Sequence, residues 1–202
     1  MSQHLRLKLP LMLVEMLSCV RKRIAECRVE GIKDEEFVMN LTKDLFGGEV
    51  TRATRTEDMT MHIDFWWDSP KKGRIGIDVK GIRKDDGVPN DKMTWLEFRA
   101  VNGKKGWLYG EEEYIAFITY SQVVYVRRET LATYAEKKIE GKETVFKRPS
   151  EYYIPYSRKR YGRDDLTIRV PMEDLIELAS GRDENGRANG FFAVFKKEEA
   201  DS

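Results

Sequence analysis

Three residues in the segment MHIDFWWDSPKKGRIGIDVKG could carry out chemistry together: Asp64, Asp78 and Lys80. Two carboxylates placed side by side repel each other, and one of them tends to hold a proton. A divalent cation removes that repulsion, and Mg²⁺ is commonly held by one or two carboxylates with waters and a substrate phosphate. A lysine beside it can orient the attacking water or stabilise developing charge. These residue types therefore suffice for phosphodiester hydrolysis with Mg²⁺, for which Mn²⁺ is an expected substitute.

Two segments of alternating residues would place these side chains on one surface. Residues 59–67 and 74–80 each alternate between apolar and polar side chains, which predicts two strands. The residues between them, 68–73, have turn chemistry, so the strands should form a hairpin. Because alternate side chains of a strand point to opposite faces, Asp64 and Asp78 should meet on the polar face, with the lysine one pleat away.

The acid-x-lysine triplet at Asp78 is a weak signal by itself. The same triplet starts at Glu136 and again at Glu140, in segments with a helical and solvated pattern. What distinguishes residues 74–80 is the apolar face of their own strand and an upstream strand that supplies a second acid. The hypothesis therefore rests on the paired strands and not on the triplet.

Further ionisable residues are candidates for supporting roles. Glu97 alternates away from its apolar neighbours in the predicted strand 94–100, so it either joins the site as a catalytic acid or is a solvated strand residue. Glu36, with Glu35 as its rival, is a candidate supporting acid, although acids also simply favour a helix N-terminus. His62 shares the predicted face of Asp64, where a hydrogen-bonded structural role is favoured over that of a base.

Basic stretches could bind the phosphates of a nucleic acid. The net charge is only +1, because 36 basic residues nearly balance 35 acidic ones, so binding depends on how charge is distributed over the folded surface. The predicted nucleic-acid-binding residues are Lys104, Lys105, Arg158, Lys159 and Arg160. A single basic cluster is usually solvated surface, but the last three lie among tyrosines. DNA is the expected partner, and RNA is not excluded as a ligand. The four tryptophans are interpreted as core residues rather than as platforms on which bases stack.

The order of elements predicts an α/β (α+β) fold, a single domain over residues 1–202 with a central mixed β-sheet flanked by helices. A helical N-terminal part is expected over about residues 10–47; Asp34 should be the N-cap of its second helix, with Phe37, Leu41 and Leu45 facing inward. Further helices are predicted over residues 128–139 and 171–179, and further strands over 94–100, 114–120, 122–126, 166–170 and 191–195. Residues 82–92 and 141–165 are predicted loops, and substrate selection is expected near residues 84–92 and 141–165.

The cysteines and the N-terminus point to a reducing, cytoplasmic environment. Cys19 and Cys27 are eight residues apart in a helical pattern and are interpreted as ordinary thiols, because a structural zinc site would need a CxxC-like spacing. The apolar run 9–20 is similar to a signal-peptide core, but Glu15 interrupts it and the amphipathic pattern continues, so it is expected to belong to the fold. No stretch is long and apolar enough to span a membrane.

Asp64 followed by Asp78-Val-Lys80, in a helix–strand–strand setting, resembles the PD-(D/E)xK nuclease superfamily, which includes restriction endonucleases and Holliday junction resolvases. The resemblance covers about residues 34–126 and implies a restriction-endonuclease-like core. In it Asp64 and Asp78 would bind the metal and Lys80 would assist the water. Ile63 stands where the usual motif has proline. The segments HIDFWW, IDVKGIRK and WLEFRAVNGKKGWLYG are also similar to uncharacterised phage members.

The hypothesis that results is a magnesium-dependent endo- or exodeoxyribonuclease. The alternative is a non-catalytic nucleic-acid-binding or protein-interaction domain that keeps the nuclease fold, but a degenerate site would be free to lose Asp64, Asp78 or Lys80. A phage-encoded inhibitor of a host protein is a third class without direct support. A homodimer is expected from resolvase-like members of the superfamily, although no residue demonstrates it.

Overall fold

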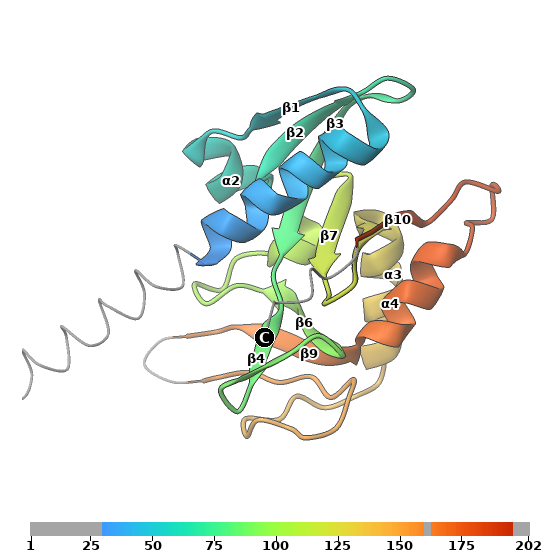
Figure 1. Cartoon of the computed structure of the whole chain (residues 1–202). Coiled ribbons are helices and arrows are strands. Elements are labelled where there is room, and N and C mark those ends of the chain that lie inside the picture. Colours follow the sequence, from blue (N-terminus) through green and yellow to red (C-terminus); the bar gives the residue numbers. More distant parts are fainter. Residues whose placement is uncertain (1–29, 160–162, 196–202) are drawn as a thin grey trace, which may run out of the picture.

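A mixed sheet of six strands forms the centre of the computed structural model, which describes residues 30–159 and 163–195 (Figure 1). The strand order is β1-β2-β3-β7-β8-β10. Its members are β1 (Glu49–Arg52), β2 (Phe65–Ser69), β3 (Gly73–Lys80), β7 (Tyr114–Ile118), β8 (Gln122–Arg127) and β10 (Gly190–Val194). β3 and β7 run parallel, and the other neighbours in this sheet run antiparallel. The predicted fold class, a mixed sheet flanked by helices in one compact domain, is confirmed.

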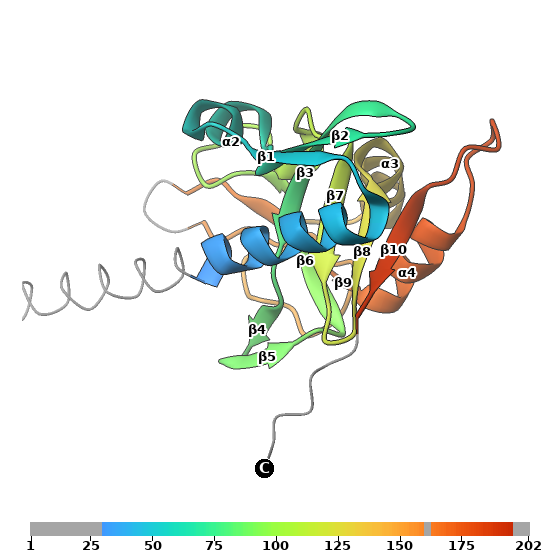
Figure 2. The same cartoon turned by 45° about the horizontal axis from the view of Figure 1, so that its top comes forward.

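Helices and two smaller sheets complete the structure. The small sheets pair β4 (Arg83–Asp85) with β5 (Val88–Asn90) and β6 (Met93–Arg99) with β9 (Leu166–Pro171). The helices are one over residues 30–46, α2 (Arg55–Met61), the short 3-10 helix η1 (Trp107–Tyr109), α3 (Arg128–Ile139) and α4 (Met172–Ser180). Figure 2 shows the first helix crossing the sheet and the β4–β5 hairpin projecting beyond the end of β3.

Each face of the central sheet has its own hydrophobic core. On one face Ile75 and Ile77 of β3 pack with Val38 of the helix over residues 30–46. On the other face Ile115 and Phe117 of β7 pack with α3, α4, β6 and η1. Fully burying such a side chain stabilises the fold by about 1.5–3 kcal/mol. Because strand side chains alternate, Asp78 must point to the second face, toward β6 and η1.

The helix over residues 30–46 differs from its prediction in two respects. It runs through Gly31 and Asp34, so Asp34 is not its N-cap. Val38 and Thr42 face inward, whereas Phe37 and Leu45 are exposed. The Thr42 hydroxyl bonds to the carbonyl of Val38 and to the Tyr125 hydroxyl, which fixes this face against β8. The predicted helix before residue 30 lies outside the described residues.

The first three residues of the predicted strand 59–67 are helical instead, at the end of α2. Thr54 caps α2, since its side chain accepts the Glu57 N–H and Glu57 accepts the Thr54 N–H. This capping box outweighs the local alternation. His62 then ends α2 in the left-handed conformation, with φ 58°. β2 consequently starts at Phe65, directly after Asp64, and the hairpin that it forms with β3 is confirmed.

The remaining predicted elements agree with the structure apart from residues 82–92. That segment, expected to be a loop, contains the β4–β5 hairpin, whose turn residues Asp86 and Gly87 both have positive φ. Such a pair of conformations suits a two-residue hairpin turn. The predicted strands 114–120, 122–126, 166–170 and 191–195 correspond to β7, β8, β9 and β10, and the predicted last two helices to α3 and α4.

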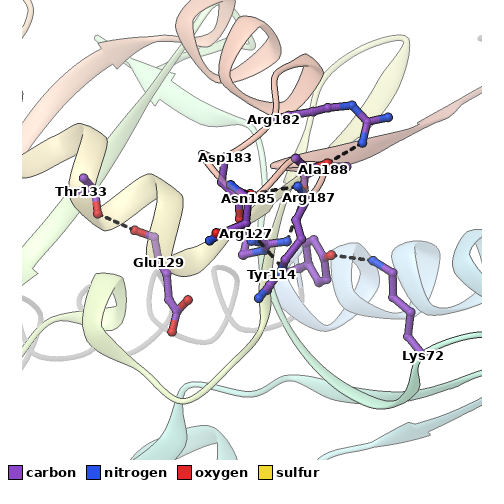
Figure 3. A network of polar contacts seen from close by, with 11 residues as sticks. Lys72, Tyr114, Arg127, Glu129, Thr133, Arg182, Asp183, Asn185, Arg187 and Ala188 are labelled. Atoms are coloured by element: carbon purple, nitrogen blue, oxygen red, sulfur yellow. Dashed lines mark hydrogen bonds and ion pairs between the residues drawn. The ribbon is translucent and has the colours of Figure 1, made fainter.

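A buried guanidinium fastens the C-terminal loop to the sheet (Figure 3). Arg127, at the end of β8, donates to Asp183 at 2.9 Å and to the Ala188 carbonyl at 3.0 Å. Asp183 also accepts the backbone N–H groups of Asn185 and Arg187. Because β10 follows this loop, the network fixes the edge of the central sheet.

Candidate active site

Asp64 and Asp78 lie side by side at the start of β2 and in β3. The register pairs Phe65 with Ile77, so the next position along each strand brings the two acids together. Their carboxyl groups are within hydrogen-bonding range of each other. The Val79 N–H donates to Asp64 Oδ2 at 2.6 Å, which fixes the orientation of that carboxyl group. Asp78 is only 3% exposed, so the pair lies at the bottom of the site.

Lys80 places its ammonium group against Asp78. Its Nζ donates to Asp78 Oδ1 at 2.8 Å and lies 2.6 Å from Oδ2. The geometry at Oδ2 is not that of a hydrogen bond, and this buried oxygen has no hydrogen-bond partner among the described residues. The same Nζ lies 4.7 Å from the ring centroid of Trp107, which is buried in η1. The ammonium group is therefore held between a carboxyl group and an aromatic face.

Burial makes both acids hold protons more tightly than usual. Burial and the adjacent Asp78 raise the pKa of Asp64 to about 7, against the opposing effect of Lys80. Burial also raises the pKa of Asp78, although Lys80 opposes the shift. A hydrogen bond between two carboxyl groups requires that one of them is protonated. The pair is therefore arranged to share either a proton or a bound cation.

Glu97 and His62, two of the predicted supporting residues, surround this centre. Glu97 of β6 lies near the backbone of Trp107 and near Lys80; burial raises the pKa of Glu97, and the Lys80 charge opposes that rise. His62 is partly buried, and burial followed by Lys80 lowers its pKa. Because the pKa of His62 is lowered, its imidazole is neutral at neutral pH.

Glu112 is a site residue that the sequence interpretation missed. It is 1% exposed, and neither carboxyl oxygen has a hydrogen-bond partner among the described residues. Burial, followed by the charge of Asp78, raises its pKa to about 9. It lies two residues before the start of β7, the parallel neighbour of β3. The sequence does show acids next to a continuous apolar strand, which could have indicated a buried acid here. Because three glutamates are consecutive (111–113), the sequence does not show which of them turns inward.

On the helix over residues 30–46, Glu35 and not Glu36 faces the acid pair. The charge of Asp64 contributes to the raised pKa of Glu35, after burial, and Glu35 forms an ion pair with Arg52. Glu36 is exposed. The helix crosses the sheet so that position 35 turns toward the start of β2, which residue spacing alone does not determine.

The predicted nucleic-acid-binding residues separate into two places. Lys104 and Lys105 are exposed in the turn after β6. Arg158 lines a cleft beside the acid pair and bonds to the buried Asp165 at 2.8 Å. Lys159 is exposed, with Nζ 5.8 Å from the Phe146 ring centroid, and Arg160 lies outside the described residues. The interpretation of the tryptophans as core fits Trp67 and Trp107, whereas Trp66 is partly exposed on β2 and Trp95 is partly exposed in the cleft.

The donor set fits a hard divalent cation such as Mg²⁺. Asp64 and Asp78 supply two carboxyl groups, one with a buried oxygen that accepts no hydrogen bond, and Mg²⁺ binds through one or two carboxylates plus water. Within residues 30–159 and 163–195, no group of three or more His, Cys, Asp or Glu side chains is arranged to hold a metal ion. The remaining ligands of a cation would therefore be water and substrate oxygens.

Comparison with protein families, curated proteins and solved structures finds no match for this chain. None of the helices in the described part is both long and apolar enough to cross a membrane.

Proposed function

We propose that this chain is a metal-dependent nuclease that hydrolyses phosphodiester bonds of DNA. The observation that carries the proposal is the contact between Asp64 and Asp78, with the Lys80 ammonium group 2.8 Å from Asp78 Oδ1. Two adjacent buried acids are unfavourable unless a proton or a cation neutralises them. A buried acid pair beside a lysine is typical of a site that binds a cation and acts on an anionic substrate.

Each residue has a distinct proposed role. Asp64 and Asp78 would hold Mg²⁺, which when bound neutralises the two carboxylates, polarises a phosphoryl oxygen and lowers the pKa of a bound water. The Val79 N–H keeps Asp64 Oδ2 in place. Lys80, positioned by Asp78 and Trp107, would orient the attacking water or stabilise the charge that develops on the phosphoryl oxygens.

The resemblance to the PD-(D/E)xK superfamily, which the same three residues carry, also supports the proposal. Its motif requires an acid, a second acid and a lysine on adjoining strands after a helix. Here the helix over residues 30–46 precedes β1, β2 and β3, and the three motif residues are Asp64, Asp78 and Lys80. Endonuclease and exonuclease activities are both compatible with this arrangement.

The test is a cleavage assay on linear, circular, single-stranded and branched DNA with Mg²⁺, Mn²⁺ or EDTA. The wild type should cut at least one substrate with a metal and none with EDTA. Asp78→Ala and Lys80→Ala should each lower the rate by at least about 100-fold, as for loss of a group that stabilises a transition state.

Matched controls come from the same protein. Asp68→Ala removes an exposed acid from the same hairpin, and Lys137→Ala removes an exposed lysine from α3. Both should cut like the wild type. If the wild type cuts nothing with Mn²⁺, or if Asp78→Ala and Lys80→Ala cut as well as the controls, the nuclease proposal is wrong. DNA binding without cleavage would favour the non-catalytic alternative.

A further inference from the structure

A cleft of about 320 Å³ lies next to the proposed active site. Glu97 and Trp107 belong to its lining, and the Trp107 ring is the one beneath the Lys80 ammonium group. The cleft is therefore continuous with the surroundings of Lys80. Its volume is at the lower end of the roughly 300–1,000 Å³ typical of small-ligand sites, which suits a ligand of the size of one nucleotide.

Three aromatic side chains line this cleft: Trp95 of β6, Trp107 of η1 and Tyr156 from the segment before β9. The ring centroids of Trp95 and Tyr156 are 6.0 Å apart, with an interplanar angle of 47°. Trp95 is partly exposed, unlike the buried tryptophans of the core. Every nucleobase has a flat π-face that can stack on such rings, and this stacking tolerates any base sequence.

Cations outnumber acids in the lining. Arg83, Lys84, Arg148 and Arg158 contribute four positive charges, and Glu97 is the acid that faces them. Arg148 and Arg158 are anchored by Asp85 and Asp165, yet their side chains remain 41% and 49% exposed. Arg148 also lies over Trp95, 5.7 Å from the ring centroid. Anchored, half-exposed guanidinium groups next to aromatic faces suit a phosphate attached to a stacked base.

We propose that this cleft binds one unpaired nucleotide of a single-stranded nucleic-acid segment, with the base against Trp95 and Tyr156 and a phosphate near Arg148 and Arg158. A base held in a duplex cannot enter, so the preferred substrates carry a single-stranded overhang, flap or frayed end. Where the strand would be cut relative to this nucleotide depends on the proposed nuclease function, but binding of the nucleotide can be measured without cleavage.

The experiment measures affinity by fluorescence anisotropy in EDTA, where no cutting occurs. The probes are a blunt DNA duplex, the same duplex with a single-stranded overhang, and single-stranded DNA and RNA oligonucleotides. The wild type should bind the overhang duplex at least about tenfold more tightly than the blunt one. Trp95→Ala should remove most of that difference, because loss of one stacked base weakens binding by about five- to 150-fold. Trp95→Phe should retain most of it.

Two further variants keep the result interpretable. Thr167→Phe adds bulk to the cleft lining and should weaken overhang binding even if Trp95→Ala fails to fold. Phe37→Ala, which removes an exposed aromatic ring outside the lining, should bind like the wild type.

The outcomes separate this inference from the proposed function. If the protein binds the overhang duplex tightly through Trp95 but never cuts DNA, the proposal for the cleft is supported and the nuclease proposal is wrong. The cleft proposal is wrong if the protein cuts DNA but binds blunt and overhang duplexes with equal affinity. It is also wrong if Trp95→Ala and Thr167→Phe weaken the binding of both duplexes to the same extent. Either result leaves the nuclease proposal intact. Equal affinity for the DNA and RNA strands indicates recognition of base and phosphate alone, whereas a preference for RNA contradicts DNA as the natural ligand.

Discussion

At the scale of single residues, the acid pair couples metal binding to pH. Burial and the neighbouring Asp78 raise the pKa of Asp64 from its ordinary value of 3.8 to about 7. A raised carboxyl pKa means that the folded state keeps a proton which the unfolded chain has lost. The contribution of Asp64 to the stability of the fold is therefore fully present below about pH 4 and disappears as the pH rises through about 7. Since the proton and the cation compete for the same oxygens, metal binding should strengthen over the same interval.

We expect 10 mM Mg²⁺, roughly the scale that saturates a weak site, to raise the melting temperature more at pH 8 than at pH 5.5. In Asp64→Asn, which lacks one of the two metal-binding carboxylates, the Mg²⁺ effect should be small at both pH values, whereas Asp68→Asn, on the exposed part of β2, should behave like the wild type. Thermal unfolding with Mg²⁺ and with EDTA provides the measurement. An equal Mg²⁺ effect at both pH values would count against Asp64 as a metal ligand.

Glu112 permits a second prediction at the same scale. With a pKa of about 9 it is neutral at pH 7, and deprotonating it means leaving a buried charge without a hydrogen-bond partner among the described residues. Because the folded pKa is raised, the wild type loses stability as the pH rises from about 4.5 toward about 9. Glu112→Gln, which has no charge to lose, should match the wild type at pH 5 and melt at a higher temperature at pH 8.5. A constant difference across that range would show that the carboxyl group does not titrate as described.

At the scale of elements, the site depends on a close approach between β6 and η1. A Cβ atom on Gly106 would lie 2.3 Å from the Glu97 carbonyl oxygen and 2.7 Å from its carbon, both backbone atoms that cannot move alone. Gly106→Ala must therefore shift β6 or η1, and with them Glu97 and Trp107. We expect a loss of about 1–3 kcal/mol in the free energy of unfolding, measured in urea, and slower cleavage.

The matched control is Gly31→Ala, in the helix over residues 30–46. A Cβ atom there would meet no heavy atom of the described residues within 4 Å, and alanine favours a helix over glycine by about 1 kcal/mol. This variant should be as stable as the wild type or more so. If Gly106→Ala unfolds at the wild-type urea concentration, the tight contact of β6 with η1 is not required.

At the scale of the whole molecule, the distribution of charge matters more than its sum. The net charge is +1, yet the cleft lining collects four cations against one acid. Binding of a single strand should weaken as KCl is raised, with a slope of about −0.7 in log affinity against log salt for each phosphate contacted. Arg83→Ala should reduce the magnitude of this slope by about 0.7, while Lys137→Ala on α3 should leave it unchanged. Anisotropy titrations over a series of KCl concentrations test this, and identical slopes would remove Arg83 from the interface.

The central residues could be predicted from sequence because they depend on local rules. Period-two alternation and a turn placed Asp78 and Lys80 on one face of a hairpin, and the β2–β3 register bears out that hairpin. The neighbouring stretch was predicted incorrectly because the Thr54 capping box makes residues 55–61 helical, which alternation does not reveal. Asp64 still reaches Asp78 because β2 begins immediately after it.

The surroundings of the acid pair were decided by tertiary packing. The angle at which the helix over residues 30–46 crosses the sheet turns Glu35, and not Glu36, toward Asp64. The parallel pairing of β7 with β3 buries Glu112, and β6 brings Trp95 to Tyr156 across more than 60 residues of sequence. By itself the sequence determined which side chains share a strand face, because alternation is local. Only the tertiary structure decided what covers that face, because contacts between distant segments depend on how whole elements pack.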